Sequence, residues 1–144
     1  MNPVVRRAMA AGNKAAAWVY RRTNGRIGGK AKGVPVLLLT VPGRKTGRPR
    51  SVPVAFFEHD GGYLVTASAG GMKANPQWIH NLRVAGKAHI HIREHQYDVD
   101  SRVTDSGERD ELWQNVVLAR APSFAKYGER SGRAIPIAVL TPRS

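Results

Sequence analysis

Between Val34 and Thr141 the chain is divided into short apolar runs of β-strand length, and this pattern excludes folds built mainly from long helices. Asp60-Gly61-Gly62 predicts a tight hairpin turn between the second and third runs. No strand–helix–strand alternation appears. We therefore predict a mainly β (α+β) fold, a small antiparallel barrel with short helices outside it. The expected strands are residues 34–41, 51–57, 63–69, 87–94, 97–103 and 134–141.

Capping residues predict two helices within this part of the chain. Asn75 suits an N-cap, Pro76 suits the first helical position, and the helix should close near Gly86. Asp105 and Glu108 have the spacing of a capping arrangement, and apolar residues follow at helical spacing as far as Pro122. The second helix should have about four turns.

Residues 4–22 predict a basic amphipathic helix. At about 100° per residue, the small and apolar side chains fall on one arc and the basic ones on the opposite side. That arc comprises Val5, Met9, Gly12, Ala16 and Val19, and Arg7, Lys14 and Arg21 lie opposite. Such a helix either packs on the domain or lies on an anionic membrane surface. With the Gly- and Lys-rich loop that follows, it forms an expected N-terminal segment, residues 1–33, before a barrel domain, residues 34–144.

The positive charge is concentrated in the first part of the chain. The net charge is +13, and residues 1–57 hold 12 basic and no acidic side chains. Phosphates, polycarboxylates, an anionic membrane or a nucleic acid are the partners that such charge favours. Aromatic residues make up 7% of the chain and form no strand motif for stacking bases, so no nucleic-acid partner is expected. The absence of cysteine excludes disulfides and thiolate chemistry and is compatible with a cytoplasmic protein.

Residues 43–50, the cation loop, contain four cations and two glycines between two predicted strands. Glycines allow backbone N–H groups to point at an anion, and arginine and lysine add charge-assisted hydrogen bonds to phosphate or carboxylate oxygens. The spacing of a P-loop is absent. The pattern favours an anion-binding loop over a merely charged hairpin.

The histidines do not predict a metal site. His89, His91 and His95 should share one strand face, but Arg93 lies among them and no carboxylate joins them. We expect these histidines to face solvent. Ser68 precedes Gly70-Gly71 without the surroundings of a hydrolase nucleophile, so serine hydrolysis is disfavoured.

Several motifs in one order resemble the actinobacterial deazaflavin-dependent nitroreductase family, which includes F420H2-dependent quinone reductases. The resemblance covers nearly the whole chain after Trp18. It implies a split β-barrel of the flavin- and deazaflavin-binding type and an enzyme that transfers hydride from reduced coenzyme F420 to a quinone-like, nitro or other conjugated acceptor. The motifs are residues 27–29, 34–41, 43–50, 65–71, 75–82 and 134–139.

The resemblance also implies a set of site residues. Arg44, Lys45, Thr46 and Arg50 match the family's positions for the cofactor's phosphate and carboxylates. Ser68 and Tyr127 are the candidate catalytic residues, as proton donors or orienting groups. The positions implied for the deazaflavin ring are Ser51, Val52, Pro53, Val54, Ala55, Thr66, Ala67, Ser68, Ala69, Gln77, Trp78, Ile79, His80, Asn81 and Phe124.

The chain departs from the family's prototype in the acceptor pocket. Where the prototype has several tyrosines, this sequence has Ala55, Ala121 and Phe124 and keeps Tyr127, and Ala69 replaces a lysine. We expect a roomier pocket with fewer hydrogen-bond donors. The alternatives are a barrel that binds flavin mononucleotide and a basic nucleic-acid-binding barrel.

The expected partners are a small-molecule acceptor and, through the basic helix, the anionic inner face of the cell membrane. The protein would then be cytoplasmic and peripheral to that membrane. The chain is expected to be a monomer or a homodimer.

Overall fold

The computed structural model describes the backbone of residues 3–31, 33–68 and 75–143, with side chains from residue 12 onward except that of residue 31. Its strands form one antiparallel sheet in the order β1-β2-β3-β4-β7-β6-β5, and pairing of β2 with β5 closes this sheet into a barrel. The predicted barrel is therefore confirmed. The strands are β1 Lys30–Ala31, β2 Val34–Pro42, β3 Pro49–His59, β4 Gly62–Thr66, β5 Lys87–Ile92, β6 His95–Val103 and β7 Ile137–Pro142.

The apolar run in β2 is continuous because both faces of this strand are covered. Leu37 and Leu39 point into the barrel core, where they meet residues such as Ile90 and Leu140. The alternate residues of β2, among them Leu38, lie under the N-terminal helix. Because successive side chains point to opposite faces of the strand, this one apolar run contributes to two separate hydrophobic clusters.

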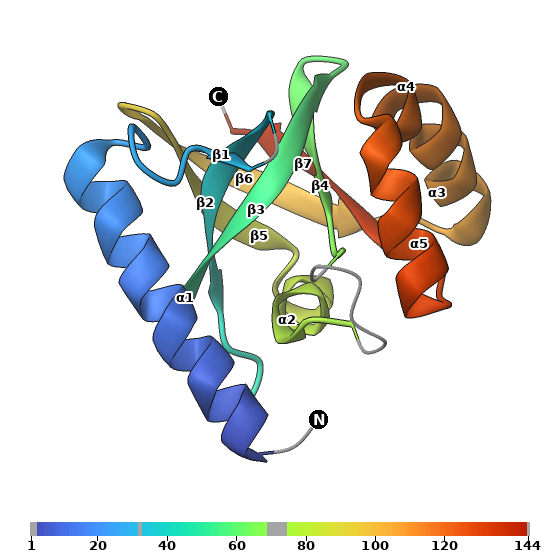
Figure 1. The fold of residues 1–144 in the computed structure, drawn as a ribbon. Helices are drawn as coiled ribbons and strands as arrows, with labels where there is room; N and C mark the ends of the chain where they lie inside the picture. The colour runs from blue at the N-terminus through green and yellow to red at the C-terminus, as the bar shows by residue number, and fades with distance from the viewer. Residues whose placement is uncertain (1–2, 32, 69–74, 144) are drawn as a thin grey trace.

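Helices cover the barrel on two sides and at one end (Figure 1). α2 packs Ile79 and Leu82 into the barrel core. Asp105 caps α3 as predicted, because its Oδ1 accepts a hydrogen bond from the Glu108 backbone N–H at 2.9 Å. The other helices pack on the outer face with Phe57 and Leu64. Besides α1, the helical segments are α2 Gln77–Ala85, α3 Ser106–Leu112, η2 Trp113–Val117, α4 Leu118–Arg120, η3 Pro122–Phe124 and α5 Ala125–Ser131.

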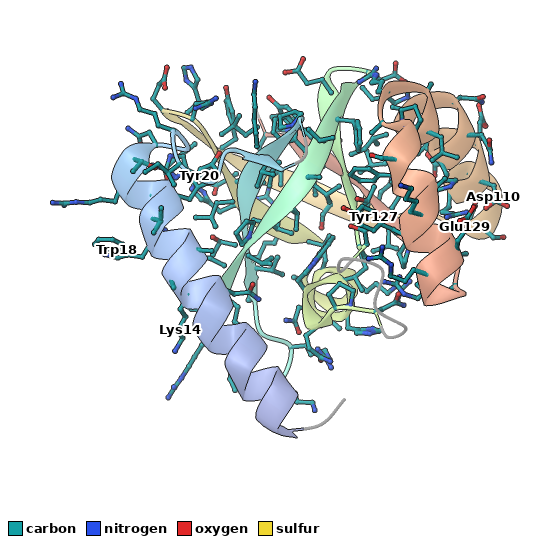
Figure 2. All side chains as sticks on the ribbon, in the orientation of Figure 1. Lys14, Trp18, Tyr20, Asp110, Tyr127 and Glu129 are labelled. Atoms are coloured by element: carbon teal, nitrogen blue, oxygen red, sulfur yellow. The ribbon has the colours of Figure 1, made fainter. Side chains whose placement is uncertain are left out.

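Helix α1, Pro3–Thr23, packs on β2 by a different face from the predicted one. Ala17 and Tyr20 are buried on it, whereas Gly12 and Ala16 of the predicted arc are exposed. The Tyr20 hydroxyl donates to the Val36 carbonyl at 3.0 Å and accepts from a backbone N–H of the barrel. The large ring of Tyr20 buries more apolar surface than glycine or alanine can, so it sets the rotation of the helix. Figure 2 shows Tyr20 directed toward the sheet and Trp18 and Lys14 directed away from it.

Three further expectations of the sequence are wrong. His91 is buried against the Tyr20 ring, 5.3 Å between centroids, and does not face solvent. A turn at Arg93, where φ is 56°, places His95 on the next strand, so the three histidines do not share one face. Residues 24–33 are more than a loop, because β1 pairs with β2.

Other boundaries also differ from the prediction. β4 ends at Thr66, three residues before its predicted end, and β7 begins at Ile137, after Pro136. No helix within the described part of the chain has the length and hydropathy needed to cross a bilayer.

Candidate functional site

A groove of about 1390 Å³ runs along β3, with walls from α1, α2 and the segment that leads into α5. Figure 1 shows α1 and α5 on opposite sides of β3 and α2 below it. Most of the site residues expected from the sequence line this groove, although they come from distant parts of the chain. They are Arg44, Lys45, Thr46, Arg50, Ser51, Val52, Pro53, Val54, Ala55, Thr66, Ser68, Gln77, Trp78, Asn81, Phe124 and Tyr127.

Several expected residues do not line the groove. Ala67 and Ile79 have no exposed surface and belong to the barrel core. His80 lies outside the lining, and burial, Arg44 and Arg83 lower the pKa of its imidazole. Ala121 is buried among the outer helices, so it does not widen the groove. Ala69 lies outside the described residues.

The sequence analysis missed the groove wall that the N-terminal segment provides. The groove lining includes Lys14, Arg21 and Lys30, which add positive charge to it. The Arg21 Nη2 donates to the Ser51 Oγ at 2.5 Å, and this Oγ lies 2.7 Å from the Thr40 Oγ1. The high basic charge of residues 1–57 was the only sign of this contribution, and it could not place the cations in space.

The cation loop is a tight, hydrogen-bonded turn with exposed charges. The Gly43 N–H donates to the Arg48 carbonyl and the Gly47 N–H to the Gly43 carbonyl, each at 2.8 Å. Gly47 has a φ of 73°, which favours glycine. The Thr46 Oγ1 accepts from the Arg48 N–H at 3.2 Å. The backbone is thus constrained while all four cations remain exposed.

Arg44 is held in place by two amide side chains of α2. The Asn81 Oδ1 accepts from the Arg44 backbone N–H at 3.1 Å and from its Nη1 at 2.8 Å. The Gln77 Oε1 accepts from the Arg44 Nη2 at 2.9 Å. Because these acceptors are neutral, they orient the guanidinium without cancelling its charge, which suits a group that binds an anion.

Thr66 places an unsatisfied polar atom in the groove wall. Its side chain is 3% exposed, and its Oγ1 is buried without a hydrogen-bond partner. A buried hydroxyl without a partner is costly to folding stability.

At the other wall, Phe124 and Tyr127 form an edge-to-face pair with ring centroids 5.0 Å apart. Tyr127 is half-buried and points from α5 toward the barrel (Figure 2). Ser68 is also half-buried in the lining. The groove therefore combines a fixed cationic end with apolar and aromatic walls and a few hydroxyl groups.

This combination fits an anionic cofactor that carries a flat ring, since cations would hold the anionic part and the walls would enclose the ring. Among the described residues no group of three histidine or acidic side chains could hold a metal ion. The fold and the groove together define a split β-barrel of the cofactor-binding oxidoreductase type.

Comparison with known proteins identifies the family. The model of the F420H(2)-dependent quinone reductase family matches residues 13–142. A curated F420H(2)-dependent quinone reductase of Mycobacterium tuberculosis strain H37Rv is 36% identical over 128 residues, covering 87% of this chain and 86% of that protein. The chain belongs to the F420H(2)-dependent quinone reductase family.

Solved structures agree with this assignment. An F420-H2-dependent reductase superposes with a TM-score of 0.65 at 28% identity, covering 74% of this chain and 93% of that chain. Another structure, described as a domain-swapped dimer, has a TM-score of 0.65 at 27% identity and covers 88% of this chain and 98% of that one. The family model begins at residue 13, so it covers the later part of α1 as well as the barrel.

Proposed function

We propose that this enzyme binds F420H2 in the groove along β3 and reduces a quinone-like acceptor. The observation that carries the proposal is Arg44, a cation oriented by Asn81 and Gln77 at the end of a groove that is otherwise largely apolar. Family membership supports the identity of the cofactor. The residues present fit it, because exposed cations and an unsatisfied buried hydroxyl lie along one groove.

The cation loop would hold the anionic part of the cofactor. Coenzyme F420 carries a phosphodiester and a polyglutamate tail, and Arg44, Lys45 and Arg50 offer charge-assisted hydrogen bonds to such groups. Lys30 of β1 adds a further cation to the groove lining. Selectivity for a polyanionic cofactor would follow from this charge distribution.

The groove walls would hold and orient the ring and the acceptor. When bound, F420H2 supplies a hydride, so the chain itself needs no nucleophile. Pro53 and Ala55 line the β3 floor, and Trp78 and Phe124 line the sides. Thr66 supplies a hydroxyl that could pair with a polar atom of the ligand. The contribution of these residues is orientation and exclusion of water.

Tyr127 and Ser68 are the proposed proton donors or orienting groups for the reduced acceptor. Both line the groove, and their hydroxyls are of a type that can donate a hydrogen bond to a quinone oxygen. Y127F and S68A should each lower kcat while leaving F420 affinity within about twofold. Equal kcat in wild type and both variants would contradict this assignment.

The cofactor proposal is tested by titrating the protein into oxidised coenzyme F420 and following its fluorescence. R44A/K45A should weaken binding by several kcal/mol in total, since each charge-assisted hydrogen bond contributes about 1.5–3 kcal/mol. R102A/R143A removes the same charge from exposed ion pairs elsewhere and serves as the control. Absence of binding at micromolar protein would overturn the proposal. A yellow purified protein would instead favour flavin mononucleotide.

We also propose that α1 associates with an anionic membrane surface, where a lipid-soluble quinone would be found. Trp18 is 64% exposed, and Lys14 and Arg22 are exposed on the same helix. An exposed tryptophan beside cations is typical of a helix at a lipid interface. Arg21 should contribute less to membrane binding than the sequence suggested, because its guanidinium donates a hydrogen bond to Ser51.

Sedimentation with liposomes tests this membrane contact. Vesicles containing anionic lipid should sediment the protein at low salt, and W18S/R22E should reduce the bound fraction severalfold. Point variants are preferred to deletion of α1, because Tyr20 is part of a core cluster. V84S alters another exposed apolar residue on α2 and serves as the control. Equal sedimentation with neutral lipid would contradict electrostatic binding.

The oligomeric state is proposed as monomer or homodimer. The similar structure described as a domain-swapped dimer supports testing the dimer. Light scattering of the purified protein over a range of concentrations distinguishes the two states, since only the dimer dissociates on dilution.

A further inference from the structure

Arg133 lies behind the groove, in the connection between α5 and β7, and is not among its lining residues. Its guanidinium nevertheless reaches three oxygens on two other segments. Nη2 donates to the carbonyls of Ala67 and Ser68 at 3.0 and 3.1 Å, and Nη1 donates to the Asn75 Oδ1 at 2.6 Å. These partners lie at the exit of β4 and immediately before α2.

The Asn75 side chain is used for this contact instead of capping the helix. The N-cap of α2 is Pro76, which makes no side-chain capping hydrogen bond, whereas the sequence predicted Asn75 in that role. The start of α2 is therefore attached to the barrel through Arg133. Asn75, a residue type that commonly caps helices, therefore lies one position before the N-cap and binds Arg133 instead.

The Arg133 end of this contact is itself fixed. Its backbone N–H donates to the Ser131 Oγ at 3.3 Å, and Ser131 is buried. A few residues further on, the Pro136 carbonyl accepts from the Ala67 N–H at 2.9 Å. The connection between α5 and β7 is thus hydrogen-bonded to the end of β4 and the residues after it, through its backbone and through the Arg133 side chain. Burial lowers the pKa of the Arg133 guanidinium, in agreement with a partly buried cation.

Both segments that Arg133 joins contribute walls of the groove. Thr66 and Ser68 line it at the exit of β4, and Gln77 and Trp78 line it from the first turn of α2. Further along α2, Asn81 holds Arg44 of the cation loop. A contact that sets the position of α2 relative to β4 consequently affects both the ring-sized part of the groove and its cationic end.

We propose that Arg133 is a positioning residue for the cofactor site, whose guanidinium sets the separation between the β4 wall and the α2 wall of the groove. The inference rests on the proposed function, since it assigns the cofactor to that groove. Arginine suits the role because its planar fork can donate to three oxygens on two segments at once, whereas lysine carries a single compact donor group.

The test compares R133M with R109M. Arg109 also donates to a backbone carbonyl, that of Ile135, and packs over Trp113, but it does not line the groove or contact its walls. Both variants lose one charge; R133M loses two arginine–carbonyl hydrogen bonds and R109M loses one. R133M should raise the Kd for oxidised F420 roughly tenfold, whereas R109M should leave it within about twofold at a similar loss of Tm. Equal shifts in Kd would overturn the proposal, because they would reflect general destabilisation.

Chemical rescue is a measurement that should have no effect if Arg133 had only a general structural role. R133A should bind F420 weakly, and low millimolar guanidinium should restore its affinity severalfold, whereas the same concentration of sodium chloride should not. R133K should recover less affinity than guanidinium-treated R133A. Full affinity in R133K without added guanidinium would show that charge alone matters and would overturn the geometric argument.

A measurement without cofactor separates this proposal from the proposed function. Amide hydrogen exchange of residues 77–82 should be faster in R133M than in R109M and wild type, because the start of α2 loses its attachment. If wild type does not bind F420, the proposed function fails while this exchange difference still tests the attachment. Unchanged exchange at α2 in folded R133M would refute the attachment even if F420 binds to wild type.

Discussion

Replacing Asn81 by aspartate tests whether the charge of Arg44 binds the cofactor. Asn81 is 4% exposed, and its Oδ1 accepts two hydrogen bonds from Arg44, at 3.1 and 2.8 Å. Aspartate has nearly the same shape and keeps the oxygen that accepts both hydrogen bonds. N81D therefore preserves the geometry of the cation loop but adds a negative charge in contact with the guanidinium.

The expected effect follows from the change of a neutral amide acceptor of Arg44 into a charged carboxylate acceptor. A guanidinium already paired with a carboxylate gives up most of its attraction for a second anion, and a charge-assisted hydrogen bond contributes about 1.5–3 kcal/mol. Loss of one such bond raises the Kd about tenfold to hundredfold. Folding stability should change little, because the attraction to Arg44 offsets the cost of burying the new carboxylate.

The assay is a fluorescence titration with oxidised F420, accompanied by a thermal melt. N115D makes the same change of charge at an exposed position outside the groove lining and should bind as wild type does. N81A should weaken binding and also lower the Tm, because it removes the oxygen that accepts both hydrogen bonds from Arg44. Tight binding by N81D would refute the reasoning, since it would show that the Arg44 charge does not hold the cofactor.

Three further predictions address the rest of the molecule. T66V should raise the Tm of the cofactor-free protein by a few degrees and weaken F420 binding roughly tenfold, because it removes an unsatisfied hydroxyl that a ligand would pair with. Burial lowers the pKa of the His91 imidazole, so the unfolded chain binds a proton at this residue at a higher pH than the folded chain does. The free energy of unfolding should therefore fall as the pH drops below about 6.5. H91F should reduce the Tm difference between about pH 7.5 and pH 5.5. G62A should destabilise by about 1–3 kcal/mol, because the new Cβ would lie 2.6 Å from the Leu140 carbonyl.

Each of these three has a matched comparison. T66S keeps the hydroxyl and should bind F420 nearly as wild type does; equal affinity in T66V and T66S would contradict the role of that group. H89Q should shift the pH dependence in the opposite direction, because the hydrogen bond to Asp98 raises the pKa of His89. G12A should be neutral or stabilising by up to about 1 kcal/mol, because its Cβ would meet open space on a helix.

Local sequence patterns predicted six of the seven strands in the described part of the chain, with errors at the ends of β4 and β7, and the position of the cation loop. Alternation and turn residues act over a few neighbouring positions, so the hairpin at Asp60-Gly61 and the closure of α2 at Gly86 could be placed correctly. The Asp105 cap was predictable for the same reason. The ordered motifs also identified the family, which the comparison confirmed.

Properties that depend on contacts between distant segments required the tertiary structure. The rotation of α1 could not be predicted, because it depends on the fit of Tyr20 over β2 and not on the helix's own apolar arc. That rotation brings Arg21 to Ser51 and makes α1 a wall of the groove. Similarly, strand alternation alone could not show that His91 lies beneath α1.

The sequence by itself determined most of the elements and which residues carry positive charge. The tertiary structure decided how those charges are held: Asn81 orients Arg44 across 37 positions of sequence, and Arg133 joins Ser68 and Asn75 across 65 and 58. Short-range propensities act between neighbours along the chain, whereas these hydrogen bonds form only after the barrel has closed and brought the segments together. Their partners are therefore set by the packing of the whole molecule.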